Sequence, residues 1–302
     1  MTKLFQIITD SSCDLPQSLA DELDLRVLPL HVTIDGKTYN NYLDGREIAF
    51  KDFFDKLRAG SQGTTSAVNP EEFRAEMEPV LAAGDDLLYI GISGGISGTC
   101  WSVGLAADEL MAKYPGRQLR VIDSRGASLG EGLIPIEVAK RAQAGATMEE
   151  LVECVRSMRS RMQQFFVVDD LKYLHKGGRI GKVTGRAANM LGLKPMILFK
   201  DGEIFSGGVA RGRQKSFEKA LEQLMAYLDE RNATPDDYCI TVGYGYDEEE
   251  GKRLWMQTRA ALRAKYPTSK CEVGLLQIGC TIAVHTGPYA LGMGVMRRWK
   301  KQ

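Results

Sequence analysis

The sequence predicts an α/β protein of two domains, an N-terminal α/β/α domain on a parallel sheet and a C-terminal α/β domain with a mixed or antiparallel sheet. In the first half, short apolar runs alternate with helical stretches, as in βαβ units. The second half holds its own strands together with long amphipathic helices. The chain has 302 residues, 44% of them hydrophobic, which is enough for two such cores. We place the domains at residues 1–155 and 156–302.

Four apolar runs of the buried type predict the strands of the N-terminal sheet. These strands are expected at residues 5–10, 25–35, 86–93 and 118–123. Helices are expected after the start signal at Pro16, over 70–81 and over 99–114. The glycine-bearing segment 60–70, in contrast, is expected to form a loop.

The C-terminal half repeats the mixture of strands and helices with different connections. Strands are expected at 165–174, 195–205, 238–247 and 273–279, and helices at 149–164, 214–232 and 248–265. The cationic, glycine-broken segment 174–193 predicts a helical hairpin. Because ligands commonly bind between packed domains, we expect the site in a cleft between the two halves.

Charge and cysteine content exclude several classes of function. Lysine plus arginine and aspartate plus glutamate both total 39, so no overall field favours nucleic acid. No run approaches the roughly 18 apolar residues of a membrane span, and the N-terminal apolar run is too short for a signal peptide. We therefore expect a cytoplasmic protein. The six cysteines form no CxxC pair and no zinc-type group with the three histidines, which predicts reduced thiols and no metal site.

Polar residues collect where the predicted N-terminal strands end, the edge at which open parallel sheets bind ligands. The most informative segment is 93–99, a glycine-rich link between a strand and a helix. Ser97 is placed to cap that helix, and Ser93 is the first residue of the segment. Free amides at a helix N-terminus with flanking hydroxyls can hold an anion. The simpler interpretation, in which the serine only caps and the glycines only turn, stays open.

Two further groups supply hydrogen-bond donors of the kind that a carboxylate needs. Thr65 and Ser66 belong to a hydroxyl cluster in the predicted loop 60–70, just before a helix. His285 follows a strand, in a predicted turn rich in small residues. Histidine is able to bond a carboxylate near neutral pH. Hydroxyls are nevertheless common in loops, and a single histidine is more often structural, so neither group decides the function alone.

A hydrolase is the main alternative. Gly91 to Gly95 match the G-x-S-x-G pattern around Ser93, and Asp123 and His285 follow in the order of α/β-hydrolases. A nucleophile elbow, however, requires the helix to begin directly after the serine, and here the predicted start lies about four residues later. No HGGG-type oxyanion segment, no P-loop and no correctly placed GxGxxG occurs. The motif context therefore weighs against catalysis.

Seven stretches spread over nearly the whole chain are distinctive in combination. They are IITDSSCDLP, TTSAVNPEEF, ISGGISGT, VIDSRGASLG, YLHKGGRIG, GGVARGRQK and VHTGP. Together they resemble the DegV family, the fatty-acid-binding proteins that serve a bacterial fatty acid kinase. The resemblance implies a two-domain α/β fold with an acyl chain in an apolar tunnel and its carboxylate near the domain junction. The residues that it assigns to the carboxylate are Thr65, Ser66, Ser93, Ser97 and His285.

The resemblance also implies partners. It implies a carrier that presents the carboxylate of a long-chain fatty acid, such as palmitate, stearate or oleate, to a fatty acid kinase. The acyl phosphate is then expected to move to an acyltransferase, which can act at the membrane surface in phospholipid synthesis, or back to the carrier. No metal or nucleotide cofactor is implied. The family places an arginine for partner contact in the basic stretch that contains Arg211 and Arg213, for which a solvated loop is the alternative interpretation.

Two departures from the family pattern bear on the tunnel. The chain has Val68 and Asn69 where the family usually has proline and serine, and Tyr289 where it usually has glycine. A tyrosine ring at this point can shorten or redirect the tunnel. Two basic groups remain, and we expect their side chains to be solvated rather than in contact with a membrane surface. They comprise Lys176, Arg179, Lys182 and Arg186, and the tail 297–301.

Overall fold

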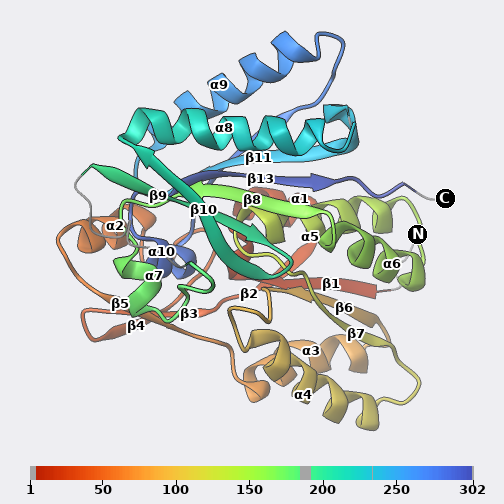
Figure 1. Ribbon diagram of the computed structural model, residues 1–302. Coiled ribbons are helices and arrows are strands. Elements are labelled where there is room, and N and C mark those ends of the chain that lie inside the picture. The colour runs from red at the N-terminus through yellow and green to blue at the C-terminus, as the bar shows by residue number, and fades with distance from the viewer. Residues whose placement is uncertain (1–4, 184–191, 233, 301–302) are drawn as a thin grey trace.

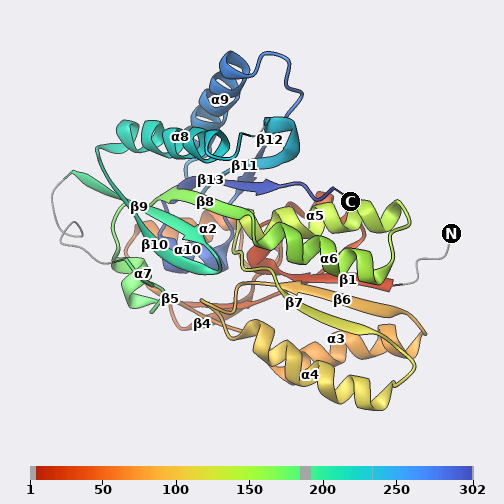
Figure 2. The same ribbon diagram turned by 45° about the vertical axis from the view of Figure 1, so that its right-hand side comes forward.

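The structure is a computed structural model that describes residues 5–183, 192–232 and 234–300. The described strands form a four-stranded, a six-stranded and a three-stranded sheet. The two larger sheets lie one above the other, with helices on the outer face of each and a further helical layer between them (Figure 1). The turned view in Figure 2 keeps the same layers. The predicted α/β class, with one parallel and one mixed sheet, is confirmed.

The first large sheet is parallel throughout and has the strand order β2-β1-β6-β7. Its strands are β1 (Phe5–Asp10), β2 (Leu25–Leu28), β6 (Asp86–Gly91) and β7 (Leu119–Asp123). The accompanying helices are α1 (Gln17–Glu22), α3 (Pro70–Ala82), α4 (Thr99–Lys113), α5 (Leu129–Gln143) and α6 (Met148–Arg159). Figure 1 shows α3 and α4 on one face and α5 and α6 on the other, which is the predicted α/β/α arrangement.

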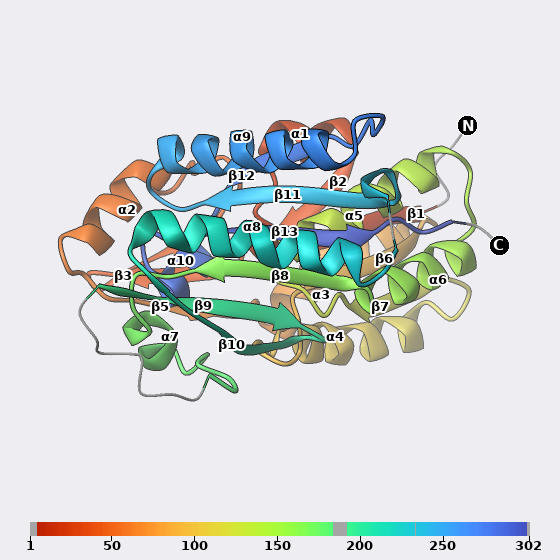
Figure 3. The ribbon, with the colours of Figure 1, turned by 45° about the horizontal axis from the view of Figure 1, so that its top comes forward.

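The second large sheet is mixed and has the order β10-β9-β8-β13-β11-β12, with only β11 and β12 parallel. Its strands are β8 (Met162–Val167), β9 (Leu193–Lys200), β10 (Glu203–Arg211), β11 (Tyr238–Tyr244), β12 (Val273–Gln277) and β13 (Leu291–Arg297). Figure 3 shows the long helices α8 (Arg213–Asp229) and α9 (Glu248–Lys265) across its outer face.

Helix α5 explains how the two large sheets stack. It contacts β1 and β6 of the first sheet and β8, β11 and β13 of the second, and it is buried over most of its length. Because a helix between two sheets has little solvent face, its buried stretch, residues 129–139, is mostly apolar, and Glu131 and Glu137 are the buried acidic residues within it. Small residues allow the close approach: a Cβ at Gly132 would lie 2.5 Å from the backbone oxygen of Cys13, on the first sheet's side.

The three-stranded antiparallel sheet corrects two expectations about the N-terminal half. It consists of β3 (His31–Ile34), β4 (Lys37–Asn40) and β5 (Gly63–Ser66), in the order β4-β3-β5. The expected strand 25–35 is therefore two strands in two sheets, divided at Pro29, which has no N–H for a ladder. The expected loop 60–70 contains β5. Helices α2 (Phe50–Arg58) and α10 (Cys280–Thr286) pack against this sheet.

The segment around the predicted domain boundary also differs from expectation. The expected helix 149–164 ends at Arg159 as α6, and the chain turns so that Met162 begins β8. The apolar helical positions end at Met158, which is the physical reason for the stop. Strand β13 was not expected at all, since its two glycines weaken the strand signal. Part of the expected hairpin 174–193 lies outside the described residues, and its described start overlaps the end of the short helix α7 (Lys172–Lys176).

Candidate functional site

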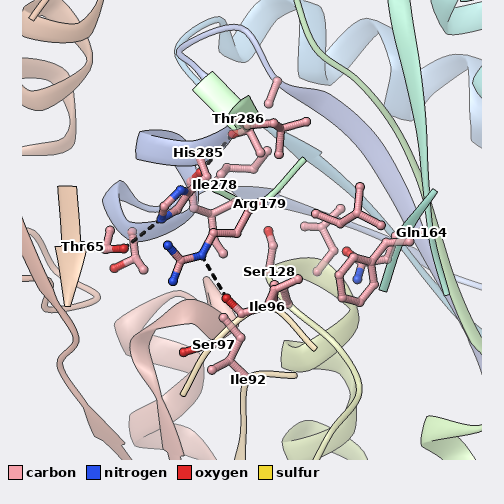
Figure 4. A pocket seen from close by; sticks show the side chains of 18 of the residues that line it. Thr65, Ile92, Ile96, Ser97, Ser128, Gln164, Arg179, Ile278, His285 and Thr286 are labelled. Atoms are coloured by element: carbon pink, nitrogen blue, oxygen red, sulfur yellow. Dashed lines mark hydrogen bonds between the residues drawn. The ribbon is translucent and has the colours of Figure 1, made fainter. Parts of the chain in front are cut away.

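A cavity lies where the three sheets and α10 meet. The space open to the centre of a water molecule is about 130 Å³, roughly ten times the 10–15 Å³ that one water needs. Most of its wall is apolar (Figure 4). The apolar side chains are Leu30, Ala67, Ile92, Ile96, Ala127, Leu129, Phe166, Leu174, Phe199, Ile204, Ile278, Ile282, Ala290 and Met293. Such a lining suits a hydrocarbon chain rather than a solvated metabolite.

One end of this cavity is polar, and four of the predicted carboxylate residues line it: Thr65, Ser66, Ser97 and His285. They come from β5, from the link before α4, and from α10. Thr65 and His285 are joined by a hydrogen bond of 2.8 Å between Oγ1 and Nε2, although 220 residues separate them. Figure 4 shows Thr65, His285, Ser97 and Arg179 on the same side of the cavity.

Arg179 supplies a cation that the sequence analysis treated as solvated charge, and that expectation is wrong. Its side chain is half-buried and lines the cavity. The guanidinium donates from Nε to the backbone oxygen of Ile96 at 3.0 Å and from Nη1 to that of Gly177 at 2.7 Å. Within the described parts of the chain it has no carboxylate partner. The polar end therefore carries a positive charge that no side chain described here neutralises.

His285 is held neutral beside this cation. It lies on the helix α10, whereas the sequence predicted a turn. Burial, and then the charge of Arg179, lowers the pKa of His285 to about 4. Its Nδ1 has no hydrogen-bond partner among the described residues, and a Cβ at Gly177 would lie 2.0 Å from it. With the proton on Nε2, the imidazole donates to Thr65 and leaves the hydroxyl hydrogen of Thr65 available to a ligand.

The two predicted serines of the glycine-rich link have different surroundings. Ser97 lines the cavity, and its Oγ accepts from the backbone N–H of Thr99 at 3.2 Å and lies 2.8 Å from the Thr99 hydroxyl. The N-cap of α4 is Gly98 rather than the expected Ser97. Ser93 is completely buried and is not in the cavity wall. Its hydroxyl donates to the backbone oxygen of Gly202 at 2.7 Å, which ties the link to the turn between β9 and β10.

The residues of the hydrolase alternative are not assembled as a triad. Asp123 accepts hydrogen bonds from the backbone N–H groups of Gly94 and Arg125, not from an imidazole. The Ser93 hydroxyl is engaged with a backbone carbonyl, as described above. In the described chain no hydrogen bond joins Ser93, Asp123 and His285, so the base that a nucleophilic serine requires is missing.

The residues that depart from the family pattern stay out of the cavity. The Tyr289 hydroxyl accepts a hydrogen bond of 2.8 Å from Arg58 Nε, and Tyr289 is not part of the wall. Val68 is buried in the core between the first sheet and its outer helices. Asn69 caps α3 in a reciprocal pair with Glu72. The wall of the cavity thus contains none of these three residues.

The two arginines expected to face a partner also differ from each other. Arg211 is exposed at the end of β10. Arg213 begins α8 and is 21% exposed. Its Nε donates to Oε1 and Oε2 of Glu250 at 3.2 Å and 3.0 Å, and its Nη2 donates to Oε2 at 2.6 Å and to the backbone oxygen of Tyr289 at 2.7 Å. The guanidinium of Arg213 therefore joins elements of its own chain, and Arg211 is the more accessible of the two.

The remaining cations of the sequence analysis are only partly described. Arg298 of the C-terminal tail pairs with Glu137 of α5 rather than with solvent alone. Arg186 and Lys301 lie outside the described residues. Where side chains are described, no group of three His, Cys, Asp or Glu side chains could hold a metal ion, and the cysteines are unbridged. None of the described helices is both long enough and apolar enough to cross a bilayer.

Sequence comparison agrees with this architecture. The model of the DegV family, described as an uncharacterised protein family, matches residues 4–298. The chain belongs to the DegV family. A DegV domain-containing protein of Clostridium perfringens is 33% identical over 286 residues, which cover 94% of each chain. A second, from Caldanaerobacter subterraneus, is 32% identical over 95% of this chain and 96% of its own.

Two solved structures share the fold over nearly the full length. A stearic acid-binding protein from Eubacterium ventriosum superimposes with a TM-score of 0.89 at 31% identity, covering 97% of this chain and 98% of its own. A DegV family protein from Thermus thermophilus, described by its fatty acid binding, gives a TM-score of 0.84 at 31% identity, covering 97% and 99%. Both proteins are thus described as binding a fatty acid.

Proposed function

We propose that this DegV protein binds one long-chain fatty acid, with the carboxylate at the polar end beside Arg179 and the acyl chain along the apolar wall. The observation that carries the proposal is the half-buried guanidinium without an acidic partner among the described residues, at one end of a cavity that is otherwise largely apolar. Two relatives with the same fold are described as binding fatty acids, which supports the assignment.

The energetics favour a ligand with both parts. Burying the methylenes of a C16 chain contributes roughly 0.8 kcal/mol each, on the order of 11 kcal/mol before the entropy costs of binding. A carboxylate taken from water needs several donors, and each charge-assisted hydrogen bond contributes about 1.5–3 kcal/mol. Arg179, Thr65 and Ser97 are the donors that we assign to it, with His285 orienting Thr65. We assign Ser93 a supporting role, because its hydroxyl ties the glycine-rich link 93–99 to the turn between β9 and β10.

Identification of the bound lipid tests this proposal directly. We expect the protein purified from bacteria to release about one long-chain fatty acid per chain, as measured by mass spectrometry of an organic extract. The delipidated protein should take up added palmitate, stearate or oleate. If neither lipid release nor uptake is observed, the proposal is wrong.

We further propose that the protein presents this carboxylate to a fatty acid kinase, without catalysis of its own, for acyl phosphate that an acyltransferase uses in phospholipid synthesis. Ser66 and Gly98 line the cavity at its polar end and are exposed, so a partner can approach the head group there. The exposed Arg211 is our candidate for contact with an acidic patch on the kinase, because rim charges mainly raise encounter rates.

Phosphorylation assays with the cognate kinase test the role of Arg211. We expect Arg211→Ala to slow phosphorylation of bound fatty acid at subsaturating carrier, with the difference narrowing at high salt. The exposed neighbour Lys215, replaced by alanine, is the matched control and should have the smaller effect. Equal rates for wild type and Arg211→Ala at low salt would exclude this surface.

A further inference from the structure

A second polar group lies in the cavity wall, away from the head-group end. Gln164 is the third residue of β8 and is 5% exposed. Figure 4 places Gln164 across the cavity from Thr65 and Ser97, beside the apolar part of the wall. Phe166, two residues further along β8, lines the same cavity, as alternate residues of a strand must share a face.

The amide of Gln164 lacks the partner that a buried polar group normally has. Its Nε2 is buried and makes no hydrogen bond within the part of the chain that the structure describes. More than about 90% of buried polar groups in proteins are paired, so each exception needs an explanation. Ser128, another polar residue of the wall, is already committed, because its hydroxyl donates to Asp14 at 2.6 Å.

The backbone around Gln164 holds the amide where it is. A Cβ at Gly130, in the first turn of α5, would lie 2.6 Å from Nε2. Gln164 is paired in register with Gly294 of β13 and Phe199 of β9, so the strand cannot slide to turn the amide outward. The amide is therefore a fixed part of the wall, and a plain alkyl chain beside it would leave its N–H groups without a partner.

Building on the proposed fatty acid binding, we propose that Gln164 hydrogen-bonds a hydroxyl group on the distal part of the acyl chain, so that the protein accepts hydroxylated long-chain fatty acids. A hydroxyl is the best match because it both donates and accepts. It can pair with the amide nitrogen or with the amide oxygen, whichever of the two faces the ligand. A keto group only accepts, and a methylene does neither.

The expected signature is a ratio of affinities. A hydroxyl loses its hydration when it enters the cavity, and the bond to Gln164 offsets that loss. Replacing Gln164 by leucine removes the offset and also removes the unpaired amide that disfavours a plain chain. The ratio of the stearate dissociation constant to the hydroxystearate dissociation constant should therefore fall in Gln164→Leu by about tenfold or more.

The experiment measures the affinities of delipidated protein for stearate and for hydroxystearates with the hydroxyl at successive carbons, from mid-chain to the methyl end. Gln163→Leu is the matched control, because Gln163 is the preceding residue of the same strand and is not in the cavity wall. We expect one hydroxyl position to be preferred by the wild type and by Gln163→Leu, and the preference to be lost in Gln164→Leu.

An unchanged ratio in Gln164→Leu for every isomer overturns the inference, as does a wild type that shows no preference among positions. The second criterion needs no variant, so the test remains decisive if Gln164→Leu fails to fold. Failure of the proposed function gives a different result, because then the wild type binds neither stearate nor any hydroxystearate.

Discussion

Two clusters of polar side chains in the interior are built in opposite ways. At the polar end of the cavity, Arg179 and His285 leave bonding capacity unused among the described residues. At the end of β1 and the start of α5, Asp10, Ser12 and Glu131 are bonded to one another and to their surroundings. The first cluster is incomplete without a ligand, while the second is complete without one.

The acidic cluster reaches completeness by retaining a proton. The Ser12 hydroxyl lies 2.6 Å from Glu131 Oε2 and also contacts Asp10 Oδ1. Since a hydroxyl has one hydrogen, one of the two carboxyls must donate to it. Burial, and then the charge of Asp10, raises the pKa of Glu131 well above its usual value, which identifies Glu131 as the protonated partner. Asp10 accepts from Ser12, from the Tyr89 hydroxyl and from the backbone N–H of Ile92.

The comparison teaches that burial of polar groups does not by itself mark a binding site. Asp14, next to the acidic cluster, is also buried, and burial raises its pKa to about 8, so it is mostly neutral at pH 7. The acidic cluster therefore adjusts its own protonation, and we assign it to stability. Arg179 cannot lose its charge in this way, since guanidinium stays protonated in proteins. A cation that must remain charged needs an anion, and we assign that anion to the ligand.

The largest effect is expected from removing this cation. Arg179→Met should weaken fatty acid binding by about 10- to 100-fold, because a charge-assisted bond to the carboxylate is lost. Displacement of a fluorescent fatty acid measures the change. Lys176→Met removes an exposed charge from the same segment and should leave the affinity unchanged. If Arg179→Met binds as tightly as wild type, the two clusters do not differ in the way described.

The reverse pattern is expected in the acidic cluster. Ser12→Ala should lower the free energy of unfolding by about 1–3 kcal/mol, because Asp10 and Glu131 lose the hydroxyl between them. Fatty acid affinity, measured at a temperature where the variant is folded, should change little. Urea unfolding monitored by circular dichroism gives the stability. A folded Ser12→Ala protein that has lost its affinity would assign this cluster to binding instead.

A smaller effect on affinity is expected at Thr65. Thr65→Val keeps the shape and removes the hydroxyl, so binding should weaken by about 10-fold, the lower end of the range for a hydrogen bond to a charged group, because only the acceptor is ionised. The neighbouring exposed residue of β5, replaced as Thr64→Val, is the control, because successive strand residues face opposite sides. Displacement titrations of both variants separate the cavity face from the outer face. Equal losses would contradict the geometry.

The smallest effect on the free energy of unfolding at neutral pH is expected from His285→Gln, because the imidazole of His285 is already uncharged at that pH. The pKa of His285 is about 4 in the folded protein against an ordinary 6.5, so the unfolded chain binds the proton first on acidification. The free energy of unfolding of the wild type should therefore decrease as the pH falls from 6.5 towards 4. The variant has no imidazole at this position and should not show this decrease. Unfolding free energies at pH 7 and pH 5 test this. A parallel pH dependence in both proteins would contradict the burial of His285.

The local sequence pattern was sufficient to predict the strands and helices whose apolar residues recur with a strong period. The strand 5–10 and the helix 248–265 were predicted at the bounds that the structure has, since apolar spacing and a helix-start signal are properties of a short stretch. The zero net charge and the two-sheet α/β class likewise follow from composition and order. Thr65, Ser66, Ser97 and His285 were selected from motifs, and all four lie in the wall of one cavity.

The tertiary structure alone decided how these residues meet and which others join them. Thr65 faces His285 because β5 pairs with β3 and α10 packs on that sheet, a long-range arrangement that no local signal encodes. Gln164 had the polar character of a helix end, and only its pairing between β13 and β9 turns it into the cavity. Arg179 has the same sequence signal as any solvated cation. Its burial depends on backbone carbonyls from two separate segments, so only the packed fold distinguishes it.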